Sequence, residues 1–187
     1  MRRCLRSKAA LLRRQPGTYN PRIFVQSKCI ADLLTAVNRL FYEATPPEQY
    51  VTLFYFDYDE TARTMRFVNC GHPSPVLIRA SGEADRLTAS STVVGLFPRW
   101  DCATGSATLA SGDRLFAFTD GATDCTVAAG QHAEPGELGE DGLVELLLAS
   151  KSSTAQAAVE EIQAELARLG GGQDLVDDQT LIALVGR

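Results

Sequence analysis

The sequence predicts an α+β fold whose strands pair mainly in antiparallel fashion. Short segments rich in β-branched and aromatic residues follow one another closely between turn residues, from about residue 50 to residue 118. Helical periodicity is confined to one segment before these strands and two segments after them, whereas a βαβ fold would alternate helix with strand. The chain has 187 residues and 45% hydrophobic residues, enough for one domain with a sizeable core.

The first helix is expected from Ser27 to Glu43, because apolar residues recur there at spacings of three and four. These residues, which we expect to form a core-facing stripe, are Ile30, Leu33, Leu34, Val37, Leu40 and Phe41. Thr45-Pro46-Pro47 ends the helix. The strands that follow are expected at Tyr50–Tyr58, Thr64–Asn69, Pro75–Arg79, Ala103–Leu109 and Gly112–Phe118, with a loop over residues 87–96.

The last third of the chain is expected to be mainly helical before it closes on a strand. A short helical start follows Asp120, an exposed loop covers residues 127–139, and an amphipathic helix begins near Leu143. A second helix is expected from Thr154 to Leu169, with Ser153 or Thr154 as its N-cap and a run of three glycines as its end. The closing strand is expected at Gln179–Val185.

Charge is unevenly distributed along the chain. Residues 1–28 carry eight Lys or Arg and no acid, although the formal net charge of the whole chain is −5. The body is therefore acidic, which argues against nucleic-acid binding and is compatible with a site that collects carboxylates. The basic start fits an organelle transit peptide, a helix cut off from something upstream, or an arm for nucleic acid or a membrane surface.

No apolar run is long enough to cross a membrane, so we expect no membrane span. The five cysteines are scattered, without the spacing of a zinc site, and are interpreted as reduced thiols of a cytoplasmic protein.

Asp120 follows the apolar run 115–118 directly and is itself followed by Gly121. An acid held at the end of a buried strand is well placed to bind a metal ion, and Gly121 lets the backbone bend there. The alternative is that Asp120 only caps the segment that follows.

A second acidic signal, Asp177-Asp178-Gln179-Thr180, precedes the closing strand. Two adjacent acids repel each other unless a cation or a donor compensates, although a solvated turn is the alternative. If the two strands are neighbours in one sheet, Asp120 and Asp177 can converge. Oxygen ligands without Cys or His fit Mg²⁺ or Mn²⁺.

Four blocks of the sequence resemble the bacterial PP2C-like (PPM) serine/threonine phosphatases of the sporulation and stress-response type. They occur in the family's order, and the resemblance covers about residues 28–187. The blocks are Pro46-Pro47-Glu48-Gln49-Tyr50-Val51-Thr52-Leu53-Phe54-Tyr55, Asn69-Cys70-Gly71-His72-Pro73-Ser74-Pro75, Gly112-Asp113-Arg114 leading to Thr119-Asp120-Gly121, and Asp177-Asp178-Gln179-Thr180.

The resemblance implies an α-β-β-α sandwich, in which two mainly antiparallel sheets are flanked by helices. It implies a binuclear Mn²⁺ or Mg²⁺ site that hydrolyses phosphoserine or phosphothreonine on a regulatory protein, for example an anti-sigma factor antagonist. A metal-activated water would be the nucleophile.

The same resemblance assigns roles to individual residues. Asp120 and Asp177 match metal-binding acids of the family, and Gly121, Asp178 and Thr180 are expected to support them. The block that contains Asn69, Gly71 and His72 is interpreted as mainly structural, with His72 as a possible proton donor by its chemistry.

The family's earlier Gly-Asp-x-Ser-Gly motif, whose Asp bridges both metals, has no counterpart in this sequence. We therefore expect an N-terminally incomplete domain over residues 28–187, with residues 1–27 as a basic segment. Residues 8–15 fit the remnant of the helix that normally follows that motif. The alternative is a catalytically impaired module that acts by protein binding. Missing strands would leave a sheet edge unpaired and favour association, so a homodimer is also expected.

Overall fold

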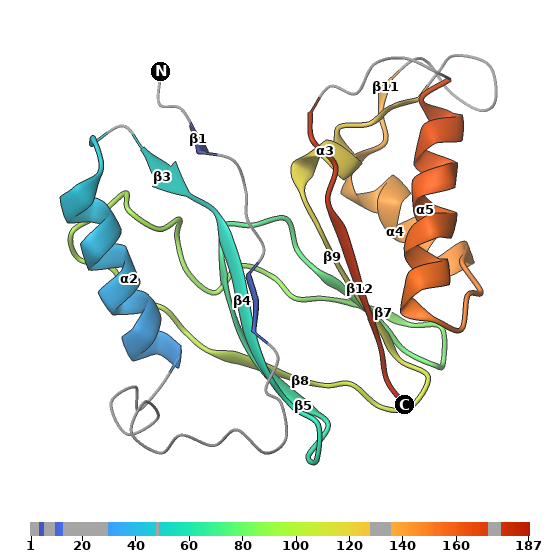
Figure 1. Ribbon diagram of the computed structural model, residues 1–187, viewed down its shortest axis with the longest axis horizontal. Helices are drawn as coiled ribbons and strands as arrows, with labels where there is room; N and C mark the ends of the chain where they lie inside the picture. The colour runs from blue at the N-terminus through green and yellow to red at the C-terminus, as the bar shows by residue number, and fades with distance from the viewer. Residues whose placement is uncertain (1–3, 6–9, 13–29, 48, 128–135, 172–176) are drawn as a thin grey trace. The chain divides into compact units, whose positions relative to one another are not determined.

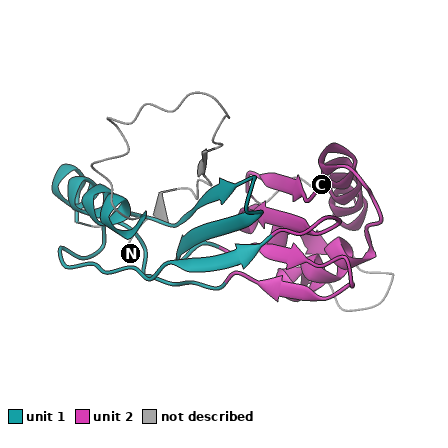
Figure 2. Ribbon diagram, turned by 90° about the horizontal axis from the view of Figure 1, so that it is seen from below, with its two compact units in different colours: residues 1–72, 88–108 teal, residues 73–87, 109–187 magenta. Residues whose placement is uncertain are grey.

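The computed structural model describes residues 4–5, 10–12, 30–47, 49–127, 136–171 and 177–187 (Figure 1). The chain divides into two compact units (Figure 2). Unit 1 comprises residues 1–72 and 88–108, and unit 2 comprises residues 73–87 and 109–187. Each unit has its own sheet and helical cover, and each is described by itself.

The sheet of unit 1 has four strands in the order β2-β4-β5-β8. Strands β4 (Leu53–Asp59) and β5 (Thr64–Cys70) form an antiparallel hairpin, and β8 (Gly105–Thr108) pairs with β5 in the same sense. Strand β2 (Ala10–Leu12) pairs with β4 in parallel. Phe54 of β4 and Val68 of β5 are both fully buried. The register places them on opposite faces of the hairpin, because Phe54 pairs with Asn69 and Val68 pairs with Tyr55.

Helix α2 (Ile30–Ala44) provides the helical part of unit 1's core. Ile30 and Leu34 pack in a cluster with Val68, Cys70, Val94 and Trp100. The buried Asn38 amide donates to the Phe97 carbonyl at 3.1 Å and accepts from the Gly95 amide at 2.7 Å. These polar contacts connect the helix to the segment that contains Gly95 and Phe97.

Part of the predicted core stripe on this helix is wrong. Leu33, Val37 and Leu40 are 37%, 37% and 62% exposed, so the buried line runs through Ile30, Leu34 and Asn38 instead. The apolar residues cover enough of the helix surface that either line of residues, the exposed one or the buried one, could have faced the core. Asn38 selects the observed line because the segment with Gly95 and Phe97 offers it both a donor and an acceptor.

The sheet of unit 2 is antiparallel throughout, in the order β12-β9-β6-β7. Strand β9 (Arg114–Phe118) is central and almost completely buried, as its uninterrupted apolar run predicted. It lies between β6 (Val76–Ile78) and β12 (Leu181–Val185). The remaining strand, β7 (Ala84–Arg86), is fully exposed.

Two helices supply the apolar cover of this sheet (Figure 1). Helix α4 (Gly139–Ala149) contributes Leu143 and Leu147, and helix α5 (Ala155–Leu169) contributes Ala158, Ile162 and Leu166. These residues form one cluster with Val76, Ile78, Phe116, Phe118, Ala122 and Cys125. Thr154 is the N-cap of α5, because its side chain accepts a hydrogen bond from the Ala157 amide at 3.2 Å.

Several local expectations need correction. Residues 10–12 form strand β2 where the remnant of a helix was expected, and the rest of 8–15 lies largely outside the described residues. Short strands were also missed at β1 (Cys4–Leu5), which pairs with β3 (Tyr50–Val51), and at β7. The expected loop over 127–139 begins and ends in a two-stranded ribbon, β10 (Thr126–Val127) and β11 (Gly136–Glu137), and α4 begins at residue 139.

Such short strands have too few residues to show periodicity. Whether they form depends on the strands with which they pair. The predicted domain boundary at residue 28 stays a prediction. Among the described residues, no helix combines the length and the apolar character that a membrane crossing requires.

Candidate metal-binding site

The candidate site lies in unit 2, where β9 ends and β12 begins. Thr119 connects the two strands at this point. Its amide donates to the Thr180 carbonyl at 3.1 Å, and the Thr180 amide donates to the Thr119 hydroxyl at 2.9 Å. The same hydroxyl donates to the Asp178 carbonyl at 3.1 Å. The strand-end segments that carry Asp120 and Asp177 are therefore joined directly.

Gly121 lies against the other side of this junction. A Cβ atom built on Gly121 would meet the Asp178 carbonyl oxygen at 2.6 Å and the Asp177 carbonyl oxygen at 3.1 Å. Backbone passes so close to backbone that no side chain fits. The Gln179 side-chain amide also donates to the Gly121 carbonyl at 3.0 Å. The supporting role expected for Gly121 stays a prediction, with which this close approach agrees.

Asp120 is the first residue of helix α3 (Asp120–Thr123), and Thr119 occupies the N-cap position. The sequence left open the alternative that Asp120 caps this helix. In the structure Asp120 lies inside the helix, and Thr119 is in the cap position. One oxygen of the Asp120 carboxylate accepts from the Gly121 amide at 3.2 Å. An acid in the first turn of a helix interacts favourably with the amide dipoles there.

Asp177 and Asp178 are exposed, and an Asp177 carboxylate oxygen accepts from the Asp178 amide at 2.7 Å. Thr180 contributes through its backbone, because both of its bonds to Thr119 are made by main-chain atoms. The five residues predicted for this end of the sheet, Asp120, Gly121, Asp177, Asp178 and Thr180, are thus brought together in one unit.

The donor set suits a hard cation only in part. Carboxylate oxygens are the ligands that Mg²⁺ and Mn²⁺ prefer, and Mg²⁺ is often held by one or two carboxylates with water completing its shell. Among the described residues, no group of three or more acidic, His or Cys side chains is arranged to hold a metal ion. The assignment of Asp120 and Asp177 as metal ligands therefore stays a prediction, and the described residues do not supply the ligands for two cations.

Asn69, Gly71 and His72 lie in unit 1, at the end of β5. The buried Asn69 side chain accepts from the His72 amide at 2.9 Å and donates to the His72 carbonyl at 3.1 Å. Gly71 has a φ of +70°, and a Cβ there would meet Val93 at 2.9 Å. These contacts close a tight turn and support the structural interpretation of this block.

Residue-level reasoning missed Thr119 and Gln179 as supports of the acids. Thr119 could have been found from the sequence, because it is a polar residue that directly follows a buried apolar run. A polar side chain that is buried there must be hydrogen-bonded. Gln179 gives no such signal in the sequence, because its partner is a carbonyl 58 residues away.

Asp113 was also missed as a structural acid. It is buried and accepts from the amides of Ala80 and Ala110, both at 3.0 Å, and from the Arg79 guanidinium at 3.0 Å. Burial favours a higher pKa for Asp113, but the two amides and Arg79 outweigh it and hold this pKa below its usual range.

Comparison with known proteins gives a consistent assignment. The family model of stage II sporulation protein E (SpoIIE) matches residues 8–185. The chain is 28% identical over 155 residues to the phosphoserine phosphatase RsbU of Bacillus subtilis (strain 168), and the match covers 82% of this chain and 44% of RsbU. The chain therefore spans less than half the length of this curated relative.

Solved structures agree on the fold. The SiaA PP2C domain of Pseudomonas aeruginosa superposes with a TM-score of 0.73 at 19% identity, covering 88% of this chain and 64% of that one. The manganese-presoaked phosphatase domain of SpoIIE from Bacillus subtilis superposes with a TM-score of 0.61 at 17% identity, covering 92% and 76%. The predicted α+β fold of PP2C type, with mainly antiparallel sheets and flanking helices, is confirmed. With nearly its whole length matched by the family model, the chain belongs to the SpoIIE family.

Proposed function

We propose that this chain is a metal-dependent protein serine/threonine phosphatase that hydrolyses phosphoserine or phosphothreonine on a regulatory protein. One observation carries the proposal: Thr119 and Gly121 join the segments of Asp120 and Asp177, so two carboxylates from distant parts of the chain lie at one end of one sheet. Membership in the SpoIIE family and the likeness to RsbU support it.

In the proposed reaction, Asp120 and Asp177 hold Mn²⁺ or Mg²⁺. When bound, the cation acidifies a water molecule and neutralises charge on the phosphoryl oxygens. Asp120 is presented by the first turn of α3, and its position is fixed by the hydrogen bonds of Thr119 with Thr180 and Asp178. Because Gly121 has no side chain, the backbone of residues 177–178 can lie close to the start of α3.

The test is phosphate release from a phosphoserine peptide in the presence of Mn²⁺. We expect activity in the parent chain and a loss of at least about a hundredfold in Asp120→Asn, which keeps the shape but removes the charge. The matched control is Asp101→Asn, an exposed acid in unit 1, which should leave the rate unchanged. No metal-dependent release by the parent chain would contradict the proposal.

The second candidate is a catalytically impaired PP2C-like module that acts by binding proteins. It is favoured by the absence of a third acidic ligand beside Asp120 and Asp177 among the described residues. It predicts a folded protein whose affinity for its partner is the same with and without Mn²⁺. The Asp120→Asn variant should bind the partner as well as the parent chain does.

Four finer assignments complete the proposal. The substrate is a phosphorylated anti-sigma factor antagonist or a similar small regulatory protein, and no nucleic acid is bound. The chain acts in the cytoplasm. It forms a homodimer, which light scattering across a range of concentrations would test.

A further inference from the structure

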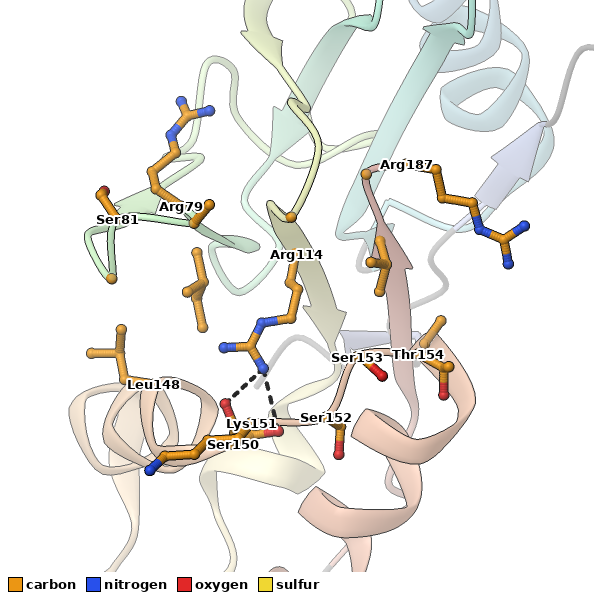
Figure 3. A pocket seen from close by; sticks show the side chains of 17 residues that line it. Arg79, Ser81, Arg114, Leu148, Ser150, Lys151, Ser152, Ser153, Thr154 and Arg187 are labelled. Atoms are coloured by element: carbon orange, nitrogen blue, oxygen red, sulfur yellow. Dashed lines mark hydrogen bonds between the residues drawn. The ribbon is translucent and has the colours of Figure 1, made fainter.

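Unit 2 contains a second site that the proposed phosphatase chemistry does not use. It is a pocket of about 860 Å³ formed by the end of β6 and its turn, the start of β9, the α4–α5 connection and the end of β12 (Figure 3). Strand β9 runs from Arg114, in the pocket, to Phe118, next to Thr119 and Asp120. At roughly 3.3 Å per residue, the pocket lies about 20 Å from the candidate metal site.

The charge of this pocket is opposite to that of the rest of the body. Its 17 lining residues include four cations, Arg79, Arg114, Lys151 and Arg187, and no acid. The whole chain has 23 acids and 18 bases, and eight of those bases lie in residues 1–28. Four of the ten remaining bases thus line one pocket of an otherwise acidic protein. Arg79 is already paired with Asp85 and Asp113, and Glu161, which accepts from the Ser150 hydroxyl, lies within electrostatic reach of Arg114. Lys151 has no such partner among the described residues, and an anion in the pocket would be attracted by both Arg114 and Lys151.

Arg114 projects into the pocket, whereas the side chains of Arg79 and Arg187 point away from Arg114 and Ser150 (Figure 3). One terminal nitrogen of the Arg114 guanidinium donates to the Ser150 carbonyl at 2.8 Å and to the Ser150 hydroxyl at 3.3 Å. This contact orients the guanidinium and leaves its other nitrogens for a ligand. Lys151 is exposed and has no ion pair among the described residues.

Uncharged groups complete the lining with both donors and apolar surface. Ser153, the N-cap Thr154 and Ala155, the first residue of α5, line the pocket. The first amides of a helix have no partner within that helix, although the Thr154 side chain already accepts from the Ala157 amide. Leu148, which is 39% exposed, lines it together with Ile78 and Val185. The pocket therefore offers a fixed cation and donors for an anionic head, and an apolar wall for the body attached to it.

We propose that this pocket binds a phosphate monoester of about nucleotide size. A guanidinium fork, a mobile ammonium and helix-terminal amides are the groups that recognise a phosphate with several acceptor oxygens. The volume falls within the range of small-molecule sites, and it exceeds what inorganic phosphate alone would fill. The site is independent of the metal centre, so its occupancy does not depend on the proposed phosphatase activity.

The test is calorimetric titration of the full chain with AMP, and separately with inorganic phosphate. Both titrations are made in EDTA so that no metal-bound phosphate contributes. We expect AMP to bind with a submillimolar Kd and inorganic phosphate to bind more weakly. The double variant Arg114→Gln/Lys151→Gln should weaken AMP binding by at least about tenfold, since it removes two charge-assisted contacts.

Two controls keep the outcome unambiguous. Arg168→Gln removes one positive charge from α5 outside the pocket and should change the Kd of AMP less than about twofold. Lys151→Gln alone, at an exposed position, should weaken binding without loss of folding. Absence of AMP binding up to millimolar concentration, or equal binding by the double variant and the parent, would overturn the proposal.

Discussion

At the scale of single residues, buried polar side chains hold this molecule at the points where chain segments must meet. The Thr119 hydroxyl accepts from one residue of the 177–180 segment and donates to another, and Asp113 accepts from three donors on two segments. Both of these buried side chains have at least one partner far away in the sequence. Removal of either side chain leaves those partners unsatisfied, which costs more than the bond itself is worth.

Asp113 makes the free energy of unfolding depend on pH in the acid range. Its pKa is lowered in the folded chain, so ionised Asp113 stabilises the fold above the ordinary pKa of an Asp. That contribution is lost as the pH falls below about 4 and through the folded-state pKa. We expect Asp113→Asn to lose about 2–4 kcal/mol of unfolding free energy at pH 7 and much less at pH 3, in urea titrations at both values.

The matched control for this prediction is Asp85→Asn. Asp85 pairs with the same Arg79, but its side chain is 51% exposed, whereas that of Asp113 is 4% exposed. An exposed pair contributes at most about 1 kcal/mol. Equal losses in the two variants would show that burial of Asp113 does not matter.

At the scale of elements, the site depends on how closely the start of α3 approaches the segment before β12. Gly121 marks this approach, because the carbonyl oxygens of Asp178 and Asp177 occupy the space that a side chain would need. Gly121 does not have a positive φ, so backbone strain is not the reason for glycine at this position. The contact distance alone explains why this position needs glycine.

Gly121→Ala should therefore separate the two elements. We expect a loss of about 1–3 kcal/mol of unfolding free energy, together with weaker Mn²⁺ binding measured by calorimetry. Gly170→Ala is the control: its Cβ would find its nearest neighbour at 3.5 Å, and the substitution should be neutral or mildly stabilising. Unchanged Mn²⁺ binding in Gly121→Ala would show that the approach does not position the acids.

At the scale of the whole molecule, each compact unit has its own sheet and its own apolar core. Both candidate metal ligands belong to unit 2, and the turn built by Asn69 belongs to unit 1. A ligand that binds only the folded chain raises the free energy of unfolding by RT ln(1 + L/Kd), where L is the free ligand concentration. Metal binding should therefore be visible as a shift in thermal unfolding.

We expect Mn²⁺ at about ten times its Kd to raise the Tm by roughly 3–6 °C, which corresponds to about 1.4 kcal/mol. EDTA should reverse the shift, and the double variant Asp120→Asn/Asp177→Asn should abolish it. Scanning calorimetry with and without the metal provides the measurement. A shift of the same size in the double variant would place the metal elsewhere in the chain.

The sequence by itself determined the elements with enough residues to show a period or an apolar run. Strand β9, helix α5 with its Thr154 cap, and the β4–β5 hairpin could all be predicted because local propensity, turn residues and burial agree there. It also located the two acidic strand ends, since an acid beside an apolar run is a local feature.

Only the tertiary structure decided which face of α2 is buried, where the short strands β2 and β7 form, and which side chains join distant segments. Thr119 reaches a carbonyl 59 residues away, and Asn38 reaches the Gly95 amide 57 residues away. The pocket around Arg114 likewise draws its cations from four separate segments. Such contacts depend on strand order and register, which neighbouring residues along the chain do not encode.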